Sequence, residues 1–293
     1  MFRRLGVALS IWACGDWLLV NKNSNKVTDM KLNVLISCMH EKDTSIIARS
    51  NVQTDVIVVN QCDKNSVEDF NFTNKKGKIC HAKFICTTER GLSKSRNMAI
   101  DNAWGDICQI CDDDETFPDN YEDIIIDAYN QNLGASVITF ALNRLDVEKP
   151  YPVEKRSLGV KEILRTSSQQ ITFLRNLLGK TSIRFDEKMG SGTGNGGGEE
   201  NRFLLDCRKA RLKMLYVPYV IATVNKGKSQ WFKGYTEKYF RDRGWASRRC
   251  LGLFMGYAFV LYNIINHRKA FTENGFSFGK VLLNMNKGFF EKR

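Results

Sequence analysis

The chain has 293 residues, 43% of them hydrophobic and 26% charged, so we expect a packed core and exclude a wholly disordered chain. Four prolines exclude a proline-rich linker protein, and no apolar run reaches the ~20 residues of a membrane-spanning helix. The net charge of +12 would suit a nucleic-acid-binding protein, but residues 226–293 carry +10 of it and residues 30–225 are neutral. We therefore predict a neutral central domain with a basic tail, and no nucleic acid as a partner.

The first 29 residues do not fit a structured domain. Two arginines precede a short apolar stretch, as in a signal peptide, but the residues that follow do not suit cleavage. Met30 resembles a natural start, since it runs straight into an apolar strand. We expect residues 1–29 to be a disordered or non-native extension, followed by a central domain at 30–225 and a C-terminal helical segment at 226–293.

Apolar runs alternate with amphipathic stretches from residue 32 onward. Strands are expected at 32–37, 55–60, 83–87, 107–111, 136–142 and 171–175. Helices are expected at 44–51, at 93–103 with Ser93 as the N-cap, and at 118–130. This alternation indicates parallel pairing in an α/β sandwich, where ligands bind beyond the carboxyl ends of the strands.

Four adjacent carboxylates, Asp112, Asp113, Asp114 and Glu115, follow the expected strand 107–111. Such groups repel one another unless a cation compensates, and their oxygens are the ligands that Mg²⁺ and Mn²⁺ prefer. Asp112 and Asp114 flank a single residue, so both can turn toward one ion. A solvated acidic turn is the alternative, but the position at the end of a buried strand favours a metal site.

Two further segments carry candidate chemistry. The helix that opens with Gly91-Leu92-Ser93-Lys94-Ser95-Arg96-Asn97 offers amides and cations to an anion, or is an ordinary capped surface helix. Six glycines lie between Gly190 and Gly198, and Glu199 and Glu200 follow. Dense glycine makes a loop mobile or allows close approach. A carboxylate after it either complements the helix dipole or acts as a general base toward a hydroxyl group.

The nine cysteines have no regular spacing, and many lie in or beside apolar runs. We expect buried, reduced thiols in a cytosolic protein. Cys108 and Cys111 have the spacing of a redox or zinc motif. No second pair and no nearby histidine pair accompanies them, so we assign them to strand packing.

Four segments in this order resemble the family 2 glycosyltransferases. They are Gly91-Leu92-Ser93-Lys94-Ser95-Arg96-Asn97, Asp112-Asp113-Asp114, Phe185-Asp186-Glu187-Lys188-Met189-Gly190 and Gly198-Glu199-Glu200. They match the family patterns GLSxARN, DxD, FDExxG and GED. The resemblance covers residues 31–224 and is nearest to bacterial enzymes that build capsule or O-antigen polysaccharide. It implies the GT-A fold of nucleotide-diphospho-sugar transferases, a Rossmann-like α/β fold with a mixed sheet flanked by helices, and identifies residues 30–225 as the catalytic domain.

The resemblance also implies roles for the acidic run and the nucleotide pocket. Asp112 and Asp114 match the pair that holds Mn²⁺ or Mg²⁺ against the donor diphosphate, and Asp113 lies between them beside the nucleotide-sugar. Arg96 and Asn97 match the segment that lines the nucleotide pocket.

Two other positions follow from the same resemblance. Glu200 matches the last acidic position of GED and is the preferred catalytic base, with Glu199 as the alternative. The family's second strand ends in DDGS, whereas this chain reads Asn60-Gln61-Cys62-Asp63. Asp63 is therefore the candidate nucleotide contact, and the nucleobase stays open.

The implied activity is inverting, metal-dependent transfer of one sugar, of the hexosyltransferase type. The donor is expected to be UDP-linked, and the acceptor to be a hydroxyl of a glycan or lipid-linked acceptor in surface polysaccharide synthesis. The QxxRW signature of processive polymerases is not visible, which favours single transfer. Two alternatives stay open: a nucleotidyltransferase acting on sugar phosphates, and a non-catalytic, membrane-associated scaffold.

The C-terminal segment interleaves aromatic with basic residues. Its 15-residue apolar run at 251–265 lies between basic clusters at 248–249 and 267–269 and is too short to span a bilayer. Basic flanks around such a run suit a helix in the membrane interface, and a helix packed on the domain is the alternative. We expect a cytoplasmic protein, peripheral on the cytoplasmic face of the membrane, at its inner leaflet.

Overall fold

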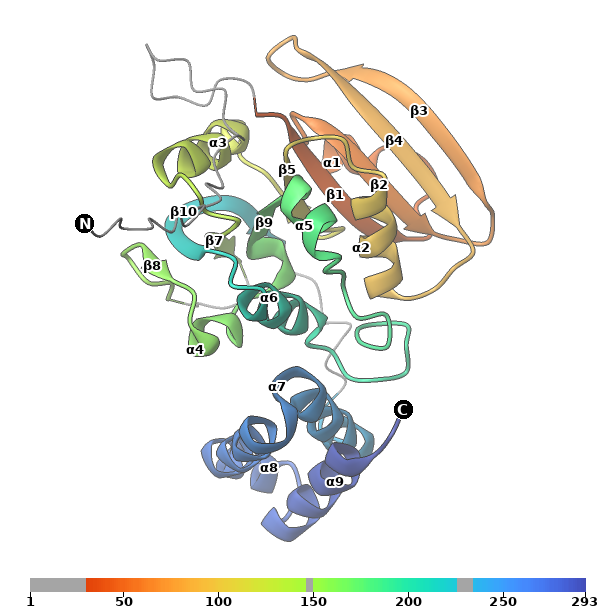
Figure 1. The fold of residues 1–293 in the computed structure, drawn as a ribbon. Helices are drawn as coiled ribbons and strands as arrows, with labels where there is room; N and C mark the ends of the chain where they lie inside the picture. The colour runs from red at the N-terminus through yellow and green to blue at the C-terminus, as the bar shows by residue number, and fades with distance from the viewer. Residues whose placement is uncertain (1–29, 146–149, 226–233) are drawn as a thin grey trace, which may run out of the picture.

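The computed structural model describes residues 30–145, 150–225 and 234–293, so the predicted extension 1–29 lies outside the described residues. A ten-stranded sheet is flanked by helices on both faces, and α7, α8 and α9 form a layer of their own below it (Figure 1). The strands are β1 (Leu32–Met39), β2 (Asp55–Gln61), β3 (Ser66–Thr73), β4 (Ile79–Thr87), β5 (Ile107–Asp112), β6 (Glu115–Thr116), β7 (Val137–Arg144), β8 (Arg156–Ser157), β9 (Ile171–Leu174) and β10 (Met214–Val224). The helices are α1 (Ile46–Arg49), α2 (Leu92–Asp101), α3 (Tyr121–Gln131), α4 (Val160–Ile163), the 3₁₀ turn η1 (Ser168–Gln170), α5 (Arg175–Thr181), α6 (Glu199–Lys209), α7 (Glu237–Asn266), α8 (Arg268–Glu273) and α9 (Phe278–Phe290).

The sheet has the order β3-β4-β2-β1-β5-β9-β7-β10-β6, and β8 pairs with β10. Strands β4, β2, β1 and β5 are parallel, so their carboxyl ends meet at one edge. The predicted mixed α/β sheet is confirmed. The sheet is mixed because β9 runs antiparallel to β5 and β7, and β3 antiparallel to β4. The connection between β3 and β4 is too short for a crossover helix and permits only a hairpin.

Hydrophobic cores fill both faces of the sheet. Side chains of β1 alternate between them: Val34 and Ile36 face the core that includes α1 and α3, whereas Leu35 faces the core with α2 and α6. The same alternation separates Cys108 from Cys111, which lie in opposite cores. The eight described cysteines are free, and seven of them are buried. Assignment of the CxxC spacing to strand packing is therefore confirmed.

The start of α2 differs from the prediction. Gly91, not Ser93, is the N-cap, with a φ of 130° that favours glycine. Ser93 lies inside the first turn, and its hydroxyl donates to the Met189 carbonyl at 2.8 Å. The hydroxyl thus links α2 to the segment before α6 instead of capping its own helix.

The C-terminal helical unit, residues 234–293, has a core of its own. Helix α7 is interrupted at Gly252, which has a φ of 76°, and both halves pack against α9. Its core side chains are Phe240, Val260, Ile264, Phe271, Val281, Met285 and Phe289. Among the described helices, none is long and apolar enough to cross a membrane.

Candidate active site

The candidate site forms where the carboxyl edge of the parallel strands meets the first turns of α2 and α6. Strand β5 delivers Asp112 at its last position, and α6 begins at Glu199 after the glycine loop, residues 190–198. Arg96 of α2 reaches both groups, donating to Asp112 Oδ1 at 2.8 Å and to Glu199 Oε1 at 2.9 Å. One guanidinium therefore joins the acidic run to the acidic helix start.

Arg96 is one of the most deeply buried charged side chains, with 1% of its surface exposed. It lies over the Phe185 ring, 5.4 Å from the ring centre. Burial alone would lower its pKa, but Asp112 and Glu199 outweigh burial and raise the pKa above its usual value. Arg96 thus stays charged and forms the bridge. The sequence predicts that it lines the nucleotide pocket, whereas in the structure its buried guanidinium is engaged by Asp112 and Glu199.

The acidic run is held by residues from η1 as well as by Arg96. Ser168 donates to Asp112 Oδ2 at 3.2 Å, and Gln169 donates to Asp114 Oδ1 at 3.3 Å. Asp113 is exposed between them. Partial desolvation by the surrounding protein is the first cause that raises the pKa of Asp113 and of Asp114, and the neighbouring carboxylates raise it further. Nothing in the sequence of η1 marked Ser168 and Gln169, because their role depends on a distant loop folding back onto β5.

Because the pKa of Asp113 and of Asp114 is raised, a bound positive charge would stabilise the ionised forms of these carboxylates. Within the described parts of the chain, no three His, Cys, Asp or Glu side chains are grouped so that they could hold a metal. A Mg²⁺ or Mn²⁺ site typically needs only one or two carboxylates when substrate phosphates supply the other oxygens. The pair Asp112 and Asp114 fits an ion of that kind.

Glu115, the fourth carboxylate of the run, is buried, unlike the three aspartates before it. Glu115 lies in β6 with 1% of its surface exposed, and its Oε1 accepts from the Asp112 amide at 2.7 Å. Its Oε2 is buried without a hydrogen-bond partner among the described residues. Burial, then Asp112, raises the pKa of Glu115 well above its usual value. Glu115 therefore faces inward and holds the turn through the Asp112 amide, and is not part of an open ion site.

Glu199 and Glu200 differ sharply although they are neighbours. Glu199 is buried, paired with Arg96, and its Oε2 accepts from the Gly198 amide at 3.0 Å. Glu200 has no hydrogen bond or ion pair with another described side chain. Burial of its carboxyl group, and then the charge of Glu199, raises the pKa of Glu200 to about 8. Glu199 is thus anchored, whereas Glu200 is free to exchange a proton near neutral pH.

Asn97 and Asp63 lie at the borders of the site. Asn97 accepts from the Phe185 amide at 2.8 Å and donates to the Phe185 carbonyl and to Glu187, so it fastens the segment before the glycine loop to α2. Asp63 is exposed just beyond β2 and pairs with Arg90 at 2.6 Å. The bridge by Arg96 brings Asp112, Glu199 and Glu200 together, while Asp63 lies beyond the end of another strand.

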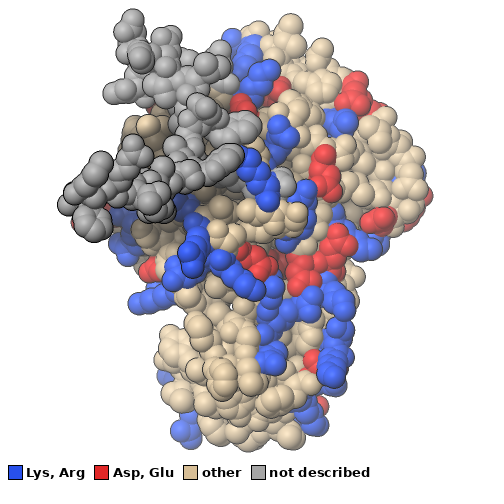
Figure 2. All heavy atoms as spheres, viewed as in Figure 1, with Lys and Arg blue, Asp and Glu red and all other residues tan. Residues whose placement is uncertain are grey.

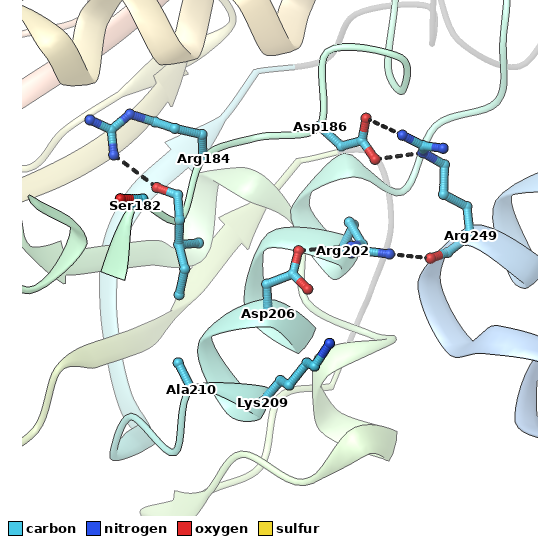
Figure 3. A pocket seen from close by; sticks show the side chains of 9 residues that line it. Ser182, Arg184, Asp186, Arg202, Asp206, Lys209, Ala210 and Arg249 are labelled. Atoms are coloured by element: carbon cyan, nitrogen blue, oxygen red, sulfur yellow. Dashed lines mark hydrogen bonds and ion pairs between the residues drawn. The ribbon is translucent and has the colours of Figure 1, made fainter. Parts of the chain in front are cut away.

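A cavity of 540 Å³ lies beside α6, away from these groups (Figure 3). Its lining includes Arg202 and Asp206, paired at 2.7 Å, and Asp186 and Arg249, paired at 2.5 and 2.8 Å. None of the candidate site residues lines it. Its lining carries four cations and two carboxylates but no acidic pair beside a candidate base, so we place the active site at the sheet edge and not in this cavity.

Comparison with known proteins shows which family the chain matches and which solved structures share its fold. The model of the family described as "Glycosyl transferase family 2" matches residues 44–192. Among solved structures, residues 1–349 of S. aureus TarS superpose with a TM-score of 0.58 at 14% identity, covering 89% of this chain and 80% of that one. Its complex with UDP-GlcNAc gives 0.54 at 16% identity with 85% and 74% covered, and its complex with UDP gives 0.53 at 16% identity with 84% and 74% covered. No curated protein sequence matches the chain.

The likeness to TarS at this identity concerns the fold, the GT-A arrangement of a mixed sheet flanked by helices. The family match is independent of it and runs from just before α1 into the glycine loop, a region that holds the acidic run and Arg96 but not Glu199 or Glu200. The predicted resemblance and GT-A fold are confirmed, and the chain belongs to glycosyl transferase family 2, as a glycosyltransferase.

Proposed function

We propose that this enzyme transfers one sugar from a nucleotide-sugar, UDP-linked, to a hydroxyl of a glycan or lipid-linked acceptor, with inversion at the anomeric carbon. The observation that supports the proposal is the Arg96 bridge, which joins Asp112 at the end of β5 to Glu199 at the start of α6, the residue before the proposed base Glu200. The crystallised complexes of TarS with UDP-GlcNAc and UDP support a UDP-linked donor for a chain of the same fold.

Glu200 is the proposed base. Its Oε takes the proton of the acceptor hydroxyl, whose oxygen forms the new bond to the anomeric carbon as the bond to the donor phosphate breaks. The nucleoside diphosphate leaves with the electrons of that bond. The raised pKa of Glu200 makes it a stronger proton acceptor than an ordinary carboxylate, and its freedom from other side chains leaves it able to meet an acceptor.

Asp112 and Asp114 would hold the Mn²⁺ or Mg²⁺ ion. When bound, the ion neutralises negative charge that develops on the departing diphosphate. The protein groups around it have separate tasks: Arg96 fixes one oxygen of Asp112, Ser168 fixes the other, and Gln169 orients Asp114. Asp113 and Asp63 lie on the open side and are proposed to contact the nucleotide, together with the α2 start that contains Asn97.

The C-terminal helical unit is proposed to attach the enzyme to the inner leaflet of the membrane, where a lipid-linked acceptor would be found. Apolar side chains are exposed on α7 after Gly252, among them Phe254, Leu261, Tyr262 and Ile265. Figure 2 shows that much of this unit presents uncharged residues, with Lys and Arg at its margins. An apolar face with a basic border suits an anionic lipid surface. The proposed location is therefore cytoplasmic and peripheral.

The proposal is tested by thermal stabilisation with a panel of nucleotide-sugars and nucleoside triphosphates, with and without Mn²⁺, followed by a product assay with the donor that binds. We expect a Mn²⁺-dependent shift with one nucleotide-sugar and release of nucleoside diphosphate. Asp114→Ala should abolish the Mn²⁺-dependent shift, and Glu200→Gln should keep it but stop transfer. Stabilisation by triphosphates alone, with release of pyrophosphate, would contradict sugar transfer. Transfer that survives Glu200→Gln would move the base elsewhere.

A further inference from the structure

The glycine loop lies between the catalytic domain and the C-terminal helical unit. On one side the Leu92 amide donates to the Ser191 carbonyl at 2.8 Å. A side chain at Gly192 would come within 3.1 Å of the Gly91 backbone. This half of the loop is therefore packed against the start of α2, next to the Arg96 bridge.

The other half of the loop is held by the C-terminal helical unit. Arg293 donates through Nη1 to Asn195 Oδ1 at 3.0 Å and to Asp242 Oδ1 at 2.7 Å. Lys238 donates to the Gly194 carbonyl. A Cβ atom at Gly196 would lie 2.8 Å from the Asp242 carbonyl oxygen, so loop and α7 are in close contact.

Arg293 is itself fixed in place. Its Nη2 donates to Glu291 at 3.0 Å, and its guanidinium lies 5.5 Å from the centre of the Trp245 ring. Its carbonyl oxygen accepts from Lys188 Nζ at 3.1 Å. With 17% of its side chain exposed, the guanidinium is a pre-oriented donor toward Asn195, not a mobile surface group.

A second clamp holds the chain on either side of the loop. Arg249 of α7 grips Asp186, ahead of the loop, with two hydrogen bonds at 2.5 and 2.8 Å (Figure 3). Arg202 of α6, behind the loop, donates to the Arg249 carbonyl. Figure 2 shows that charged residues of both signs gather at this junction. The half of the glycine loop that faces away from α2 is thus held by contacts from the C-terminal helical unit.

We propose that the C-terminal helical unit positions the catalytic base, and that Arg293 is the positioning residue that acts through Asn195 and Asp242. The inference rests on the proposed function, in which Glu200 is the base. Six glycines leave the loop with many accessible conformations, so outside contacts must select one. The loop runs directly into Glu199 and Glu200, and displacement of a reacting group by about 1 Å can cost about 100-fold in rate.

The test compares Arg293→Ala and Arg293→Lys in the full chain with Arg241→Ala as the matched control. Arg241 also pairs with Glu291, at 3.2 Å, but makes no hydrogen bond or ion pair with the described residues of the glycine loop. We expect Arg293→Ala to lower kcat about tenfold or more while donor KM stays within about twofold, because the donor diphosphate would be bound through the ion at Asp112 and Asp114 and not through the glycine loop. Arg293→Lys should recover part of kcat, and Arg241→Ala should match the unaltered chain.

Hydrogen exchange separates this inference from the proposed function. Amides of residues 190–198 should exchange faster in Arg293→Ala, while amides of β1 stay protected in both proteins. Faster exchange in the loop supports the positioning role of Arg293. If the unaltered chain shows no sugar transfer but the exchange result holds, only the proposed function is contradicted. Unchanged exchange in the loop, or an unchanged kcat beside an active unaltered chain, would overturn the inference. Equal loss of kcat in Arg241→Ala would also overturn it.

Discussion

At the scale of single residues, the site depends on one buried cation. Arg96 neutralises Asp112 on β5 and Glu199 on α6, groups 87 positions apart in the sequence that would repel each other without it. A buried charge whose partner is removed is strongly destabilising, whereas an exposed pair contributes little. The acidic run after β5 and the acidic start of α6 are therefore parts of one electrostatic unit.

We expect Arg96→Met to lower the free energy of unfolding by about 3–5 kcal/mol, because it leaves Asp112 and Glu199 facing each other without compensation. Lys75→Ala is the control. Its pair with Asp119, in which both side chains are exposed, should cost less than about 1 kcal/mol. Urea unfolding measures both. Equal losses in the two variants would show that the bridge is no more important than a surface ion pair.

The raised pKa of Glu200 predicts a pH dependence for transfer. The base acts as the carboxylate, so kcat/KM should rise with pH and level off above a pKa of about 8. Initial rates from pH 5.5 to 9.5 with saturating metal give the profile. A profile that is already flat above pH 6 would contradict the assignment of Glu200 as the base.

The pH dependence of protein stability gives a separate check on the raised pKa of Glu200. A pKa raised above the unfolded value means that the neutral carboxyl stabilises the fold below pH 4.5, and this contribution is lost as pH rises toward 8. Glu200→Gln removes the ionisation. The thermal midpoint of Glu200→Gln minus that of the unaltered chain should therefore increase between pH 5 and 8. Above pH 8 this difference should stay constant. The same difference at every pH would indicate that the variant changes packing and not charge.

At the scale of elements, the sequence predicted those whose pattern is local and missed those decided by tertiary contacts. The strand at 107–111 and the helix after the glycine loop are confirmed, because an apolar run and an acidic first turn identify them. The outward-facing strand β3 was not predicted, since much of it is exposed. Glu115 could not be separated from Asp113 either, because only the pairing of β6 with β10 turns one carboxylate inward.

The glycine loop offers a matched pair of substitutions at this scale. Neither Gly196 nor Gly197 has a φ that requires glycine, but a Cβ at Gly196 meets the Asp242 backbone at 2.8 Å, while one at Gly197 meets only the tip of Glu199 at 3.7 Å. We therefore expect Gly196→Ala to push the loop from α7 and lower kcat several-fold, and Gly197→Ala to change it little. Steady-state kinetics of the two variants decide this. A larger loss in Gly197→Ala would mean that the loop is not packed as described.

At the scale of the whole molecule, the central domain could be predicted from the order of its four sequence motifs. The contacts between that domain and the C-terminal helical unit could not be predicted. Asp112, Glu199 and Glu200 carry recognisable chemistry in the sequence itself. Arg249 and Arg293 look like two more basic residues of a basic tail, since nothing local tells that they meet Asp186 and Asn195. Long-range ion pairs leave no periodic signal. The described fold thus joins a predicted catalytic domain to a helical unit whose role is visible only in contacts.

We expect the exposed apolar face of the C-terminal helical unit to bind anionic vesicles. Phe254 is 85% exposed and Ile265 66% exposed on α7, and burying each in a bilayer would contribute about 1.5–3 kcal/mol. Phe254→Ser with Ile265→Ser should therefore weaken sedimentation with phosphatidylglycerol vesicles at least ~10-fold, whereas Val153→Ser, at a residue 87% exposed on the catalytic domain, should not. Raised salt should weaken binding further, because basic side chains border the face. If the double variant bound as tightly as the unaltered chain, the apolar face would not be the attachment surface, and a lipid-linked acceptor would have to be reached from solution.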